Sequence, residues 1–265
     1  SVLTMISPVL NTKARYKAEY GCKINLEQPT TFSEKLSWLK LFRYNNDALV
    51  AKCSDKYLVR EYIIECGLEE ILNDLYGVYD NAESIPWKKL PNKFVLKWNF
   101  GAGMNIVCAD KRKLNTRAAE LQLRTWGKVK YWLPHSEMHY KKIQKKIVCE
   151  KFLIDDSHPD VIPDYKVYCF HGEPMAILVM HDRGHEMKTE FFDTEWRTLK
   201  NTSKYGKTKE STERPSCLAF MLDASRTLSK PFPFVRCDFY IVNGKLYFGE
   251  LTFTPAGGLY TSQTQ

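Results

Sequence analysis

Two carboxylates and an arginine stand close together near the end of the sequence. Arg236 and Asp238 precede the dipeptide Asn243-Gly244, and Glu250 follows it. Asn-Gly between apolar-rich runs is a strong β-hairpin signal, so the two carboxylates are expected on neighbouring strands. Mg²⁺ prefers oxygen ligands and commonly bridges one or two carboxylates to phosphates. The segment therefore indicates a cation site, although an exposed sheet face with an Arg–Asp cross-strand pair fits the same pattern.

The register of this hairpin decides whether Asp238 and Glu250 share a face. A strict two-residue loop at Asn243-Gly244 would put them on opposite faces, because side chains alternate along a strand. A three-residue loop, 242–244, with a G1 bulge at its glycine would shift the pairing by one. We favour this second register because it gathers the charged groups and leaves the other face almost wholly apolar. The apolar face would then hold Val235, Cys237, Phe239, Ile241, Tyr247, Leu251 and Phe253, and the charged face would also hold Tyr240, Leu246 and Phe248.

A second candidate site lies where Lys97 interrupts the apolar run 94–98. The turn that follows, 99–103, contains two glycines, which let backbone N–H groups approach a phosphate while the lysine supplies a point charge. The sequence has no Walker loop, and ordinary hairpins also carry glycine in their turns. Glu150 interrupts another apolar run, 147–153. It is either exposed by alternation or positioned to accept hydrogen bonds from a ligand.

The elements expected around these residues change from helical to mixed along the chain. Apolar periodicity and capping signals, with Ser33 as the first N-cap, predict helices at 34–42, 55–66, 114–126 and 215–228. Apolar runs predict strands at 94–98, 105–108, 146–153, 164–170 and 175–180, followed by the hairpin 234–253. The segment 200–215 is rich in Thr, Ser, Lys and Glu, so it is expected to be a loop or mobile lid. The expected fold class is α+β with two lobes.

The composition excludes several classes of protein. With 265 residues, 44% hydrophobic and 26% charged, the chain can bury a globular core, which excludes disordered and fibrous classes. No apolar run approaches the roughly 18 residues that span a bilayer, and the N-terminus lacks a signal-peptide pattern. Eight cysteines without a C-x-x-C pair favour reduced thiols in a reducing, cytoplasmic compartment over zinc sites or disulfides.

The formal net charge of +8 favours anionic partners such as nucleotides, phosphorylated sugars, acidic polymers or nucleic acid. A non-catalytic nucleic-acid or polyanion binder would show steep salt dependence. The sequence contains no dense basic helix and no aromatic binding motif, so nucleic acid is not expected as a partner.

Taken in order, these pieces resemble the ATP-grasp fold, and more closely the TupA-like ATP-grasp family of teichuronopeptide and bacterial surface-polysaccharide synthesis. The resemblance runs from about Asn11 to Gly258. It rests on residues 31–41 (TFSEKLSWLKL), 55–60 (DKYLVR), 163–166 (PDYK), 232–236 (FPFVR) and 249–255 (GELTFTP). The last block is the most specific of these, and its Thr252 agrees with the TupA-like subfamily.

The resemblance implies a role for each matching residue. Contacts to ATP would come from Lys56, Lys97, Gly101, Ala102, Gly103, Glu150, Lys151, Phe152 and Leu153. Arg236 would steady the transferring phosphoryl group, and Lys166 would reach phosphate or an acyl-phosphate intermediate. Mg²⁺, with Mn²⁺ as a substitute, would be bound by Asp238, Glu250 and Thr252. The general family has an asparagine where this chain has Thr252, which leaves the number of bound metals open.

The implied activity is ATP-dependent activation of a carboxylate as an acyl-phosphate, followed by attack of an amine to form an amide. The acceptor would be an acidic sugar or amino acid of a cell-surface polymer. His181 and Arg183 could serve such an anionic acceptor, with a solvated loop as the alternative reading. The runner-up function is an ATP-dependent kinase or a glycosyltransferase that acts on a sugar in the same pathway.

The resemblance also implies an organisation and a cellular place. The nucleotide would lie between two α+β lobes. The expected division is a helical N-terminal segment with the start of the fold (1–92), a small lobe with the glycine-containing loop and hinge (93–153), and a larger lobe with the metal-binding hairpin (154–265). The enzyme would be bacterial and cytoplasmic, without a transmembrane segment. It would take a saccharide or other small-molecule substrate and associate peripherally with a membrane-bound polysaccharide assembly.

Overall fold

A computed structural model describes residues 2–157, 161–181, 188–199 and 212–260. Its α-helices are α1 (Val2–Ile6), α2 (Pro8–Tyr20), α3 (Phe32–Phe42), α4 (Ala48–Ser54), α5 (Val59–Glu65), α6 (Thr116–Gly127), α7 (Trp132–His135) and α8 (Leu218–Ser229). Its strands are β1 (Leu75–Tyr79), β2 (Phe94–Trp98), β3 (Asn105–Cys108), β4 (Ile147–Lys151), β5 (Asp164–Phe170), β6 (Glu173–His181), β7 (Lys188–Phe192), β8 (Thr198–Leu199), β9 (Phe234–Val242) and β10 (Lys245–Thr252).

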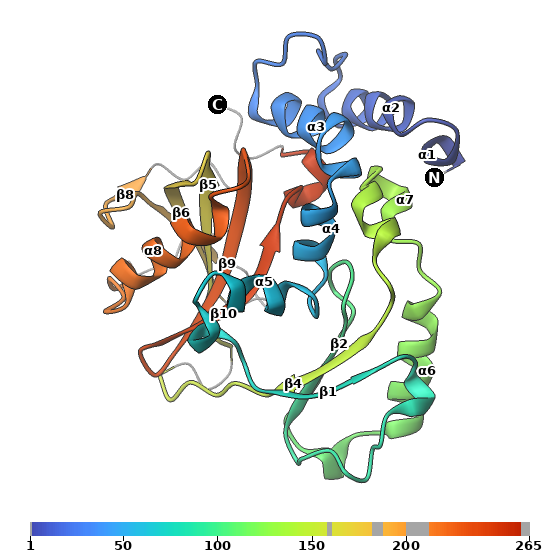
Figure 1. Cartoon of the computed structure of the whole chain (residues 1–265), viewed down its shortest axis with the longest axis vertical. Coiled ribbons are helices and arrows are strands. Elements are labelled where there is room, and N and C mark those ends of the chain that lie inside the picture. Colours follow the sequence, from blue (N-terminus) through green and yellow to red (C-terminus); the bar gives the residue numbers. More distant parts are fainter. Residues whose placement is uncertain (1, 158–160, 182–187, 200–211, 261–265) are drawn as a thin grey trace.

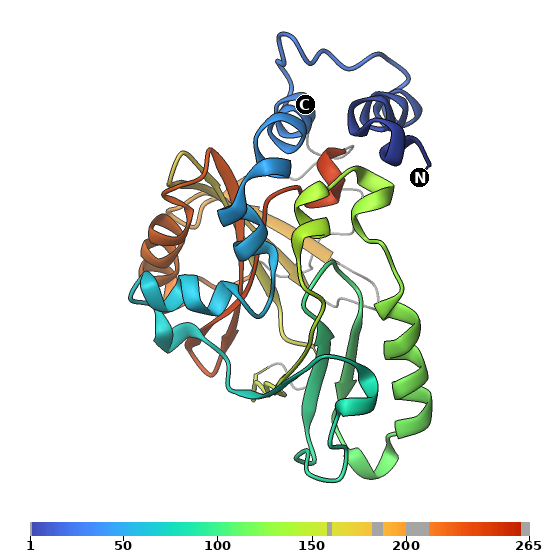
Figure 2. The same cartoon turned by 45° about the vertical axis from the view of Figure 1, so that its right-hand side comes forward.

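Two antiparallel sheets form the framework of the molecule (Figure 1). The smaller sheet has the strand order β1-β4-β2-β3 and is covered by α6. The larger sheet has the order β10-β9-β5-β6-β7-β8 and is covered by α8. Figure 2 shows the first three helices gathered at one end of the molecule. The helix α4 contacts both β10 and the 3₁₀ turn Met138–Lys142, so the N-terminal helices bridge the larger sheet and the connector before β4.

Each sheet has its own hydrophobic core. The larger sheet buries one face against α5 and α8, through side chains such as Val167, Cys237 and Phe239 of the central strands. The smaller sheet packs with α6 around Phe94, Leu96, Leu123 and Ile147. A third cluster, Leu36, Tyr168, Leu178 and Phe234, lies under α3 on the opposite face of the larger sheet. Since side chains alternate along a strand, that opposite face is the one left for polar groups between the lobes.

The N-cap of α3 is Thr31, so the prediction of Ser33 was wrong. The Thr31 hydroxyl accepts a hydrogen bond from the Glu34 backbone N–H at 3.2 Å, and the Glu34 carboxylate reaches back to complete a capping box. Ser33 instead contacts Tyr260 near the end of the chain. Burial alone would raise the pKa of Glu34, but hydrogen bonds from backbone N–H groups hold it at about 2. The Glu34 carboxylate therefore also anchors the loop before this helix, through the N–H groups of Asn25 and Thr30.

Several predicted elements differ in their limits. The helix expected at 55–66 begins only at Val59, because residues 55–58 form a turn around the Asp55 carboxylate. The helices expected at 114–126 and 215–228 begin at Thr116 and Leu218. The sequence did not reveal β1, β7 or β8. Most of the segment predicted as a loop or lid, 200–211, lies outside the described residues.

The register of the terminal hairpin is not the one predicted. Asn243 and Gly244 form a two-residue loop with φ of 49° and 78°, as in a type I′ turn, and Lys245 pairs with Val242. The pairing shifts at Gly249 instead, where a bulge brings Glu250 directly opposite Asp238. A Cβ atom on Gly249 would lie 2.9 Å from the Asp238 carbonyl oxygen, so only glycine fits without a shift.

The bulge also changes which side chains face the core. Leu246 and Phe248 pack in the core of the larger sheet, whereas Tyr247 pairs with Tyr240 on the other face. The prediction had placed Leu246 and Phe248 on the charged face and Tyr247 on the apolar face, because it put the irregularity in the loop rather than at Gly249. Its placement of Tyr240 on the charged face was correct. Asp238 and Glu250 still share the polar face, because the bulge at Gly249 shifts the pairing by one residue.

Among the helices that the structure describes, none combines the length and the apolar character needed to cross a bilayer.

One buried hydroxyl ties the N-terminal helices to the larger sheet. Tyr44 is fully buried, donates to the Phe234 carbonyl oxygen at 2.7 Å and accepts from the Phe234 N–H at 3.2 Å. Tyr44→Phe should lower the free energy of unfolding by about 1–3 kcal/mol, because two buried backbone groups lose their partner. Urea unfolding measures this change. The control Tyr76→Phe, at an exposed position, should stay within about 0.5 kcal/mol of the parent, and equal effects of the two changes would contradict the assignment.

Candidate functional site

The polar face of the larger sheet carries the charged residues of three neighbouring strands, β5, β9 and the edge strand β10. The alternation that sends Val167, Cys237 and Leu251 into the core turns their neighbours the other way. The face consists of Asp164 and Lys166 on β5, Arg236 and Asp238 on β9, and Glu250 and Thr252 on β10. The cross-strand pairs Lys166–Asp238, Asp238–Glu250 and Arg236–Thr252 make these side chains immediate neighbours.

Asp238 is the centre of this charged group. Arg236 donates to both oxygens of the Asp238 carboxylate at 2.6 Å, and Lys166 Nζ donates to Oδ2 at 2.7 Å. Burial alone would raise the pKa of Asp238, but the charges of Arg236 and Lys166 hold it below its usual value. A buried carboxylate between two buried cations is stable only as a complete set, because removing one partner leaves an uncompensated charge.

Glu250 joins this network to the N-terminal half of the chain. Its Oε2 lies 3.7 Å from Lys56 Nζ, and its Oε1 accepts from the Thr252 hydroxyl at 3.1 Å. Lys56 Nζ also donates to the carbonyl oxygen of Gly101, in the turn between β2 and β3. Burial and the nearby charge of Lys97 lower the pKa of Lys56, against the opposite influence of Glu250. Three segments distant in sequence therefore meet at one lysine.

The Asp55-Lys56 turn is held in place by its own carboxylate. One oxygen of Asp55 accepts from the N–H groups of Tyr57 and Leu58, and the other accepts from the Asn99 side-chain amide at 2.8 Å. The Lys56 N–H in turn donates to the Asn99 carbonyl oxygen at 2.9 Å. Asn99 follows β2 directly, so these contacts lock the lysine-bearing turn to the small sheet. Sequence analysis did not assign Asn99 a role.

Gly101 and Gly103 adopt left-handed conformations, with φ of 68° and 77°. A Cβ atom on Gly101 would lie 2.5 Å from a ring carbon of Tyr131, so the turn needs glycine both for its backbone and for its packing. Ala102, between them, is exposed. The aromatic connector before β4 therefore supports the glycine-containing turn through Tyr131.

A cavity of about 300 Å³ lies beside this turn. Lys97 and Glu150 both line it, with Lys97 Nζ 2.5 Å from Glu150 Oε2. Its further lining includes Asn73, Val95, Asn105, Val107, residues 151–155, Val161, Ile162, Asp164 and Tyr240. Val107 is 61% exposed and Ile154 is 42% exposed, although both are large apolar residues. A mostly apolar cavity with a few convergent charged groups is the usual form of a small-molecule site.

Sequence analysis missed several residues of this lining, among them Asn73 and Val107. The signal for Val107 was available, because it lies across from Val95 in the hairpin whose Lys97 was singled out. Asn73 could not be found in this way, since its side chain reaches the site by donating to the Lys151 carbonyl oxygen at 2.9 Å. The Lys151 N–H donates to the Asp74 carbonyl oxygen, so both backbone groups of Lys151 already have partners.

The oxygen ligands available for a metal ion are Asp238, Glu250 and Thr252. The Asp238 carboxylate accepts three hydrogen bonds of the roughly four that a carboxylate can accept, and the Glu250 side chain is 35% exposed. The described residues contain no group of three or more His, Cys, Asp and Glu side chains that could enclose an ion. The partly exposed Glu250 beside the buried Asp238 fits Mg²⁺ held jointly with phosphate oxygens, rather than an all-protein metal site.

His181 lies away from this cluster. It ends β6 on the face that carries Ile177 and Val179, and its Nε2 contacts the Thr212 hydroxyl at 2.9 Å and Glu190 at 3.5 Å. It does not line the cavity described above. Arg183, predicted with it, lies outside the described residues.

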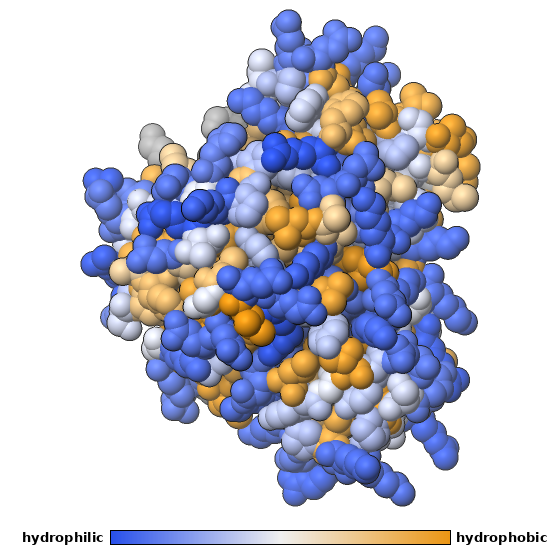
Figure 3. Space-filling view, viewed as in Figure 1, coloured by the Kyte–Doolittle hydropathy of each residue, from blue (hydrophilic) through white to orange (hydrophobic). Residues whose placement is uncertain are grey.

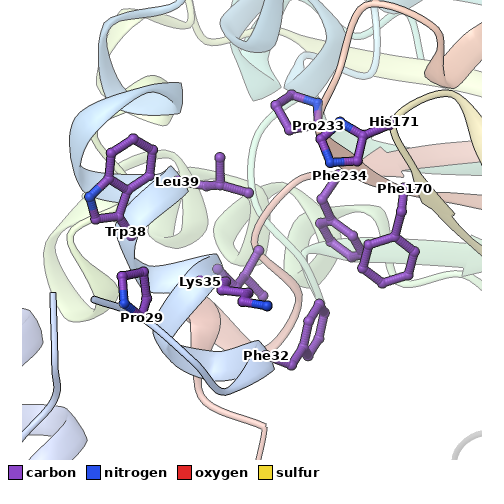
Figure 4. A pocket seen from close by; sticks show the side chains of 10 residues that line it. Pro29, Phe32, Lys35, Trp38, Leu39, Phe170, His171, Pro233 and Phe234 are labelled. Atoms are coloured by element: carbon purple, nitrogen blue, oxygen red, sulfur yellow. The ribbon is translucent and has the colours of Figure 1, made fainter. Parts of the chain in front are cut away.

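A second cavity, of about 240 Å³, lies between α3 and the start of β9 (Figure 4). The rings of Phe32, Phe170 and Phe234 gather at one end of it, while Trp38 and Pro29 lie at the other. None of the predicted site residues lines this cavity.

The family model described as TupA-like ATPgrasp matches residues 34–265. Among solved structures, the chain is similar to D-alanine–D-alanine ligase from Bacillus anthracis, with 16% identity, a TM-score of 0.47, and coverage of 77% of this chain and 59% of that one. It is similar to a biotin carboxylase–ATP-analogue complex from Campylobacter jejuni, with 14% identity, a TM-score of 0.49, and coverage of 84% and 46%.

The chain spans about half of the length of these two structures. No curated protein matches its sequence.

Lys97 gives a direct test of the cavity as a nucleotide site. Lys97→Met should weaken binding of ATP by about 10- to 100-fold, because a charge-assisted contact to phosphate is worth about 1.5–3 kcal/mol. Isothermal titration calorimetry with a non-hydrolysable ATP analogue measures the affinity. The matched control is Lys93→Met, an exposed lysine just before the same strand, which should bind as the parent does. Unchanged affinity of Lys97→Met would place the phosphates elsewhere.

Asp238 should show its role in the pH dependence of stability. Its folded-state pKa is lowered, so the stabilisation is present above the unfolded pKa of about 3.9 and is lost as pH falls through the folded pKa. Asp238→Asn should cost about 3 kcal/mol at pH 7, where Arg236 and Lys166 lose their counter-charge. Urea unfolding at pH 7 and below pH ~4 should show this difference shrinking with acid. Asp223→Asn, at an exposed position, is the control, and a cost independent of pH would contradict the ionic explanation.

Proposed function

Because the chain belongs to the TupA-like ATP-grasp family, we propose that it is an ATP-dependent ligase that activates a carboxylate as an acyl-phosphate and joins it to an amine. The predicted family and the α+β fold with two sheets are confirmed. We further propose a bacterial, cytoplasmic enzyme that modifies a surface polysaccharide or capsule precursor and associates peripherally with the membrane where such polymers are assembled. The division into lobes at 93–153 and 154–265 belongs to the same proposal.

The observation that carries this proposal is the series of contacts that joins Glu250, Lys56 and the glycine-containing turn beside the cavity that Lys97 lines. Lys56 contacts both the glycine-containing turn and Glu250, while Lys97 lines the neighbouring cavity with Glu150. Each lysine already contacts one carboxylate, Glu250 for Lys56 and Glu150 for Lys97, and a bound polyphosphate would add negative charge that both cations can share.

The apolar residues of the cavity would bind the base, and the lysines would bind the phosphates. The apolar walls Val95, Val107 and Ile154 suit a planar base, because they offer exposed apolar surface beside the hinge. Lys56 and Lys97 would neutralise phosphate charge and hold it against the glycine-containing turn. In phosphoryl transfer such positioning and charge neutralisation supply most of the catalysis.

Arg236 and Lys166 would act at the transferring phosphoryl group. Their shared partner Asp238 fixes both cations on the polar face, so that their geometry does not depend on the substrate. Thr252 holds Glu250 from one side and Arg236 from the other, at 3.1 and 3.2 Å. We propose Asp238 and Glu250, with Thr252 beside them, as the holders of Mg²⁺, which would supply charge neutralisation of the phosphates when bound. Mn²⁺ could take its place.

The reaction class is tested by the substrates required for ADP formation. ADP and inorganic phosphate should appear only when a carboxylate, such as a uronic acid or an amino acid, and an amine are both present. The product should then have the summed mass of the two substrates less one water. A phosphorylated sugar formed without an amine would instead establish the kinase, and a nucleotide sugar consumed without ATP would establish the glycosyltransferase.

Glu250→Gln is the matching variant for this assay. It removes the charge that faces Lys56 and the bound ion, so kcat should fall by about 10²- to 10³-fold. Nucleotide affinity measured in parallel separates loss of chemistry from loss of folding. Glu173→Gln, an exposed carboxylate at the start of β6, is the control and should retain full activity. Equal rates for the two variants would remove Glu250 from the reaction.

A further inference from the structure

The first helix, α1, turns its one polar side chain, Thr4, inward and its apolar side chains outward, and α2 buries polar side chains beside it. Thr4 donates to the Leu133 carbonyl oxygen at 2.6 Å, and Asn11 donates to the Pro134 carbonyl oxygen at 3.1 Å and to the Ser136 hydroxyl at 2.9 Å. Thr4 and Asn11 are each 2% exposed. These polar contacts dock α1 and α2 on α7. The arrangement is the reverse of a water-facing helix, which buries its apolar side.

The apolar side chains of this segment are correspondingly open to solvent. The exposed fractions are 75% for Val2, 41% for Leu3, 66% for Met5, 71% for Ile6 and 51% for Leu10. These five side chains, here called the N-terminal apolar patch, are five of the seventeen exposed large apolar side chains among the described residues. Figure 3 shows apolar residues gathered at the end of the molecule where α1 and α2 lie. A contiguous apolar patch on a surface marks an interaction site.

The charge around the patch is strongly one-sided. Residues 1–23 hold four basic side chains and one acidic one, and residues 128–146 hold six and one. This surplus equals the entire formal charge of +8, so the rest of the chain is balanced. The middle of the second segment lies against the first, because α7 contacts both α1 and α2 (Figure 1). The exposed lysines are Lys13, Lys17, Lys23, Lys128, Lys130, Lys141, Lys142 and Lys145.

We propose that this surface docks on an anionic lipid membrane. The N-terminal apolar patch would enter the boundary between headgroups and acyl chains, while the lysines around it meet the negatively charged headgroups. Trp132 on α7, with Lys141 Nζ 5.2 Å from its ring centre, adds the type of aromatic side chain that favours this boundary. A second copy of the chain is a poorer occupant, since pairing two such surfaces would bring together their whole positive surplus.

The docking surface is separate from the nucleotide cavity. No residue that lines the cavity falls within 1–23 or 128–146. The inference rests on the peripheral membrane association proposed above, but it does not depend on the ligase chemistry. Vesicle binding and nucleotide binding can therefore fail independently.

The test is co-sedimentation of the protein with vesicles. Binding to phosphatidylcholine vesicles containing about 30% phosphatidylglycerol should be at least about tenfold tighter than to phosphatidylcholine alone, and raised salt should weaken it. M5E/I6E should weaken binding to the anionic vesicles at least about tenfold, because it places charge where apolar side chains insert. K13E/K17E should remove most of the preference for anionic lipid. The control L121E/M175E alters two equally exposed apolar side chains elsewhere and should bind as the parent does.

Nucleotide affinity, measured for every variant, reports whether the fold is intact. Vesicle binding that M5E/I6E leaves unchanged would overturn the proposal, as would equal binding to neutral and anionic vesicles. A protein that ignores vesicles but forms a concentration-dependent dimer, lost in M5E/I6E, would also overturn it and would assign the N-terminal apolar patch to self-association.

Discussion

The site depends on the strict alternation of side chains along three strands and on one residue that resets it. The larger sheet must bury one face against α5 and α8, so every second residue of β5, β9 and β10 is apolar. The residues between them are free to be charged, and they collect on a single face. With a two-residue loop and no irregularity, the alternation in β10 would turn Glu250 toward the core. The bulge at Gly249 corrects it and places Glu250 opposite Asp238.

That constraint explains how so many charges are held in a confined space. Asp238 is enclosed by Arg236 and Lys166, so the cluster is neutralised within itself before any ligand arrives. Lys56 and Lys97 are placed differently. Lys56 contacts Glu250 and the glycine-containing turn, while Lys97 contacts Glu150 and lines the cavity. The larger sheet thus supplies a rigid charged platform, and the small sheet and the N-terminal turn supply the cations that face outward. Such a division suits a site that must hold a polyanion against a fixed framework.

The N-terminal helices are held by buried polar contacts, in contrast to the sheets. In the sheets, apolar side chains drive burial and polar ones are left at the surface. In α1 and α2, hydrogen bonds from Thr4 and Asn11 to the α7 segment decide which side is buried. The apolar side is left outside, among nearly unopposed lysines. Two parts of the molecule therefore present different chemistry, the charged face of the larger sheet and the basic, partly apolar surface of the first helices.

The amino-acid sequence by itself determined the family, the strands that carry Lys97, Glu150 and Asp238, and the turn at Asn243-Gly244. These features depend on local periodicity and on the order of short motifs along the chain. The tertiary structure alone decided the hairpin register, because the choice between a bulge in the loop and one at Gly249 rests on whether Leu246 and Phe248 can reach the core. It also decided the part played by Asn73 and Asn99, whereas the N-cap of α3 was readable from the local spacing of Thr31 and Glu34. The side chains of Asn73 and Asn99 bond to backbone groups far away in sequence, and no local pattern records which distant segment a side chain will meet.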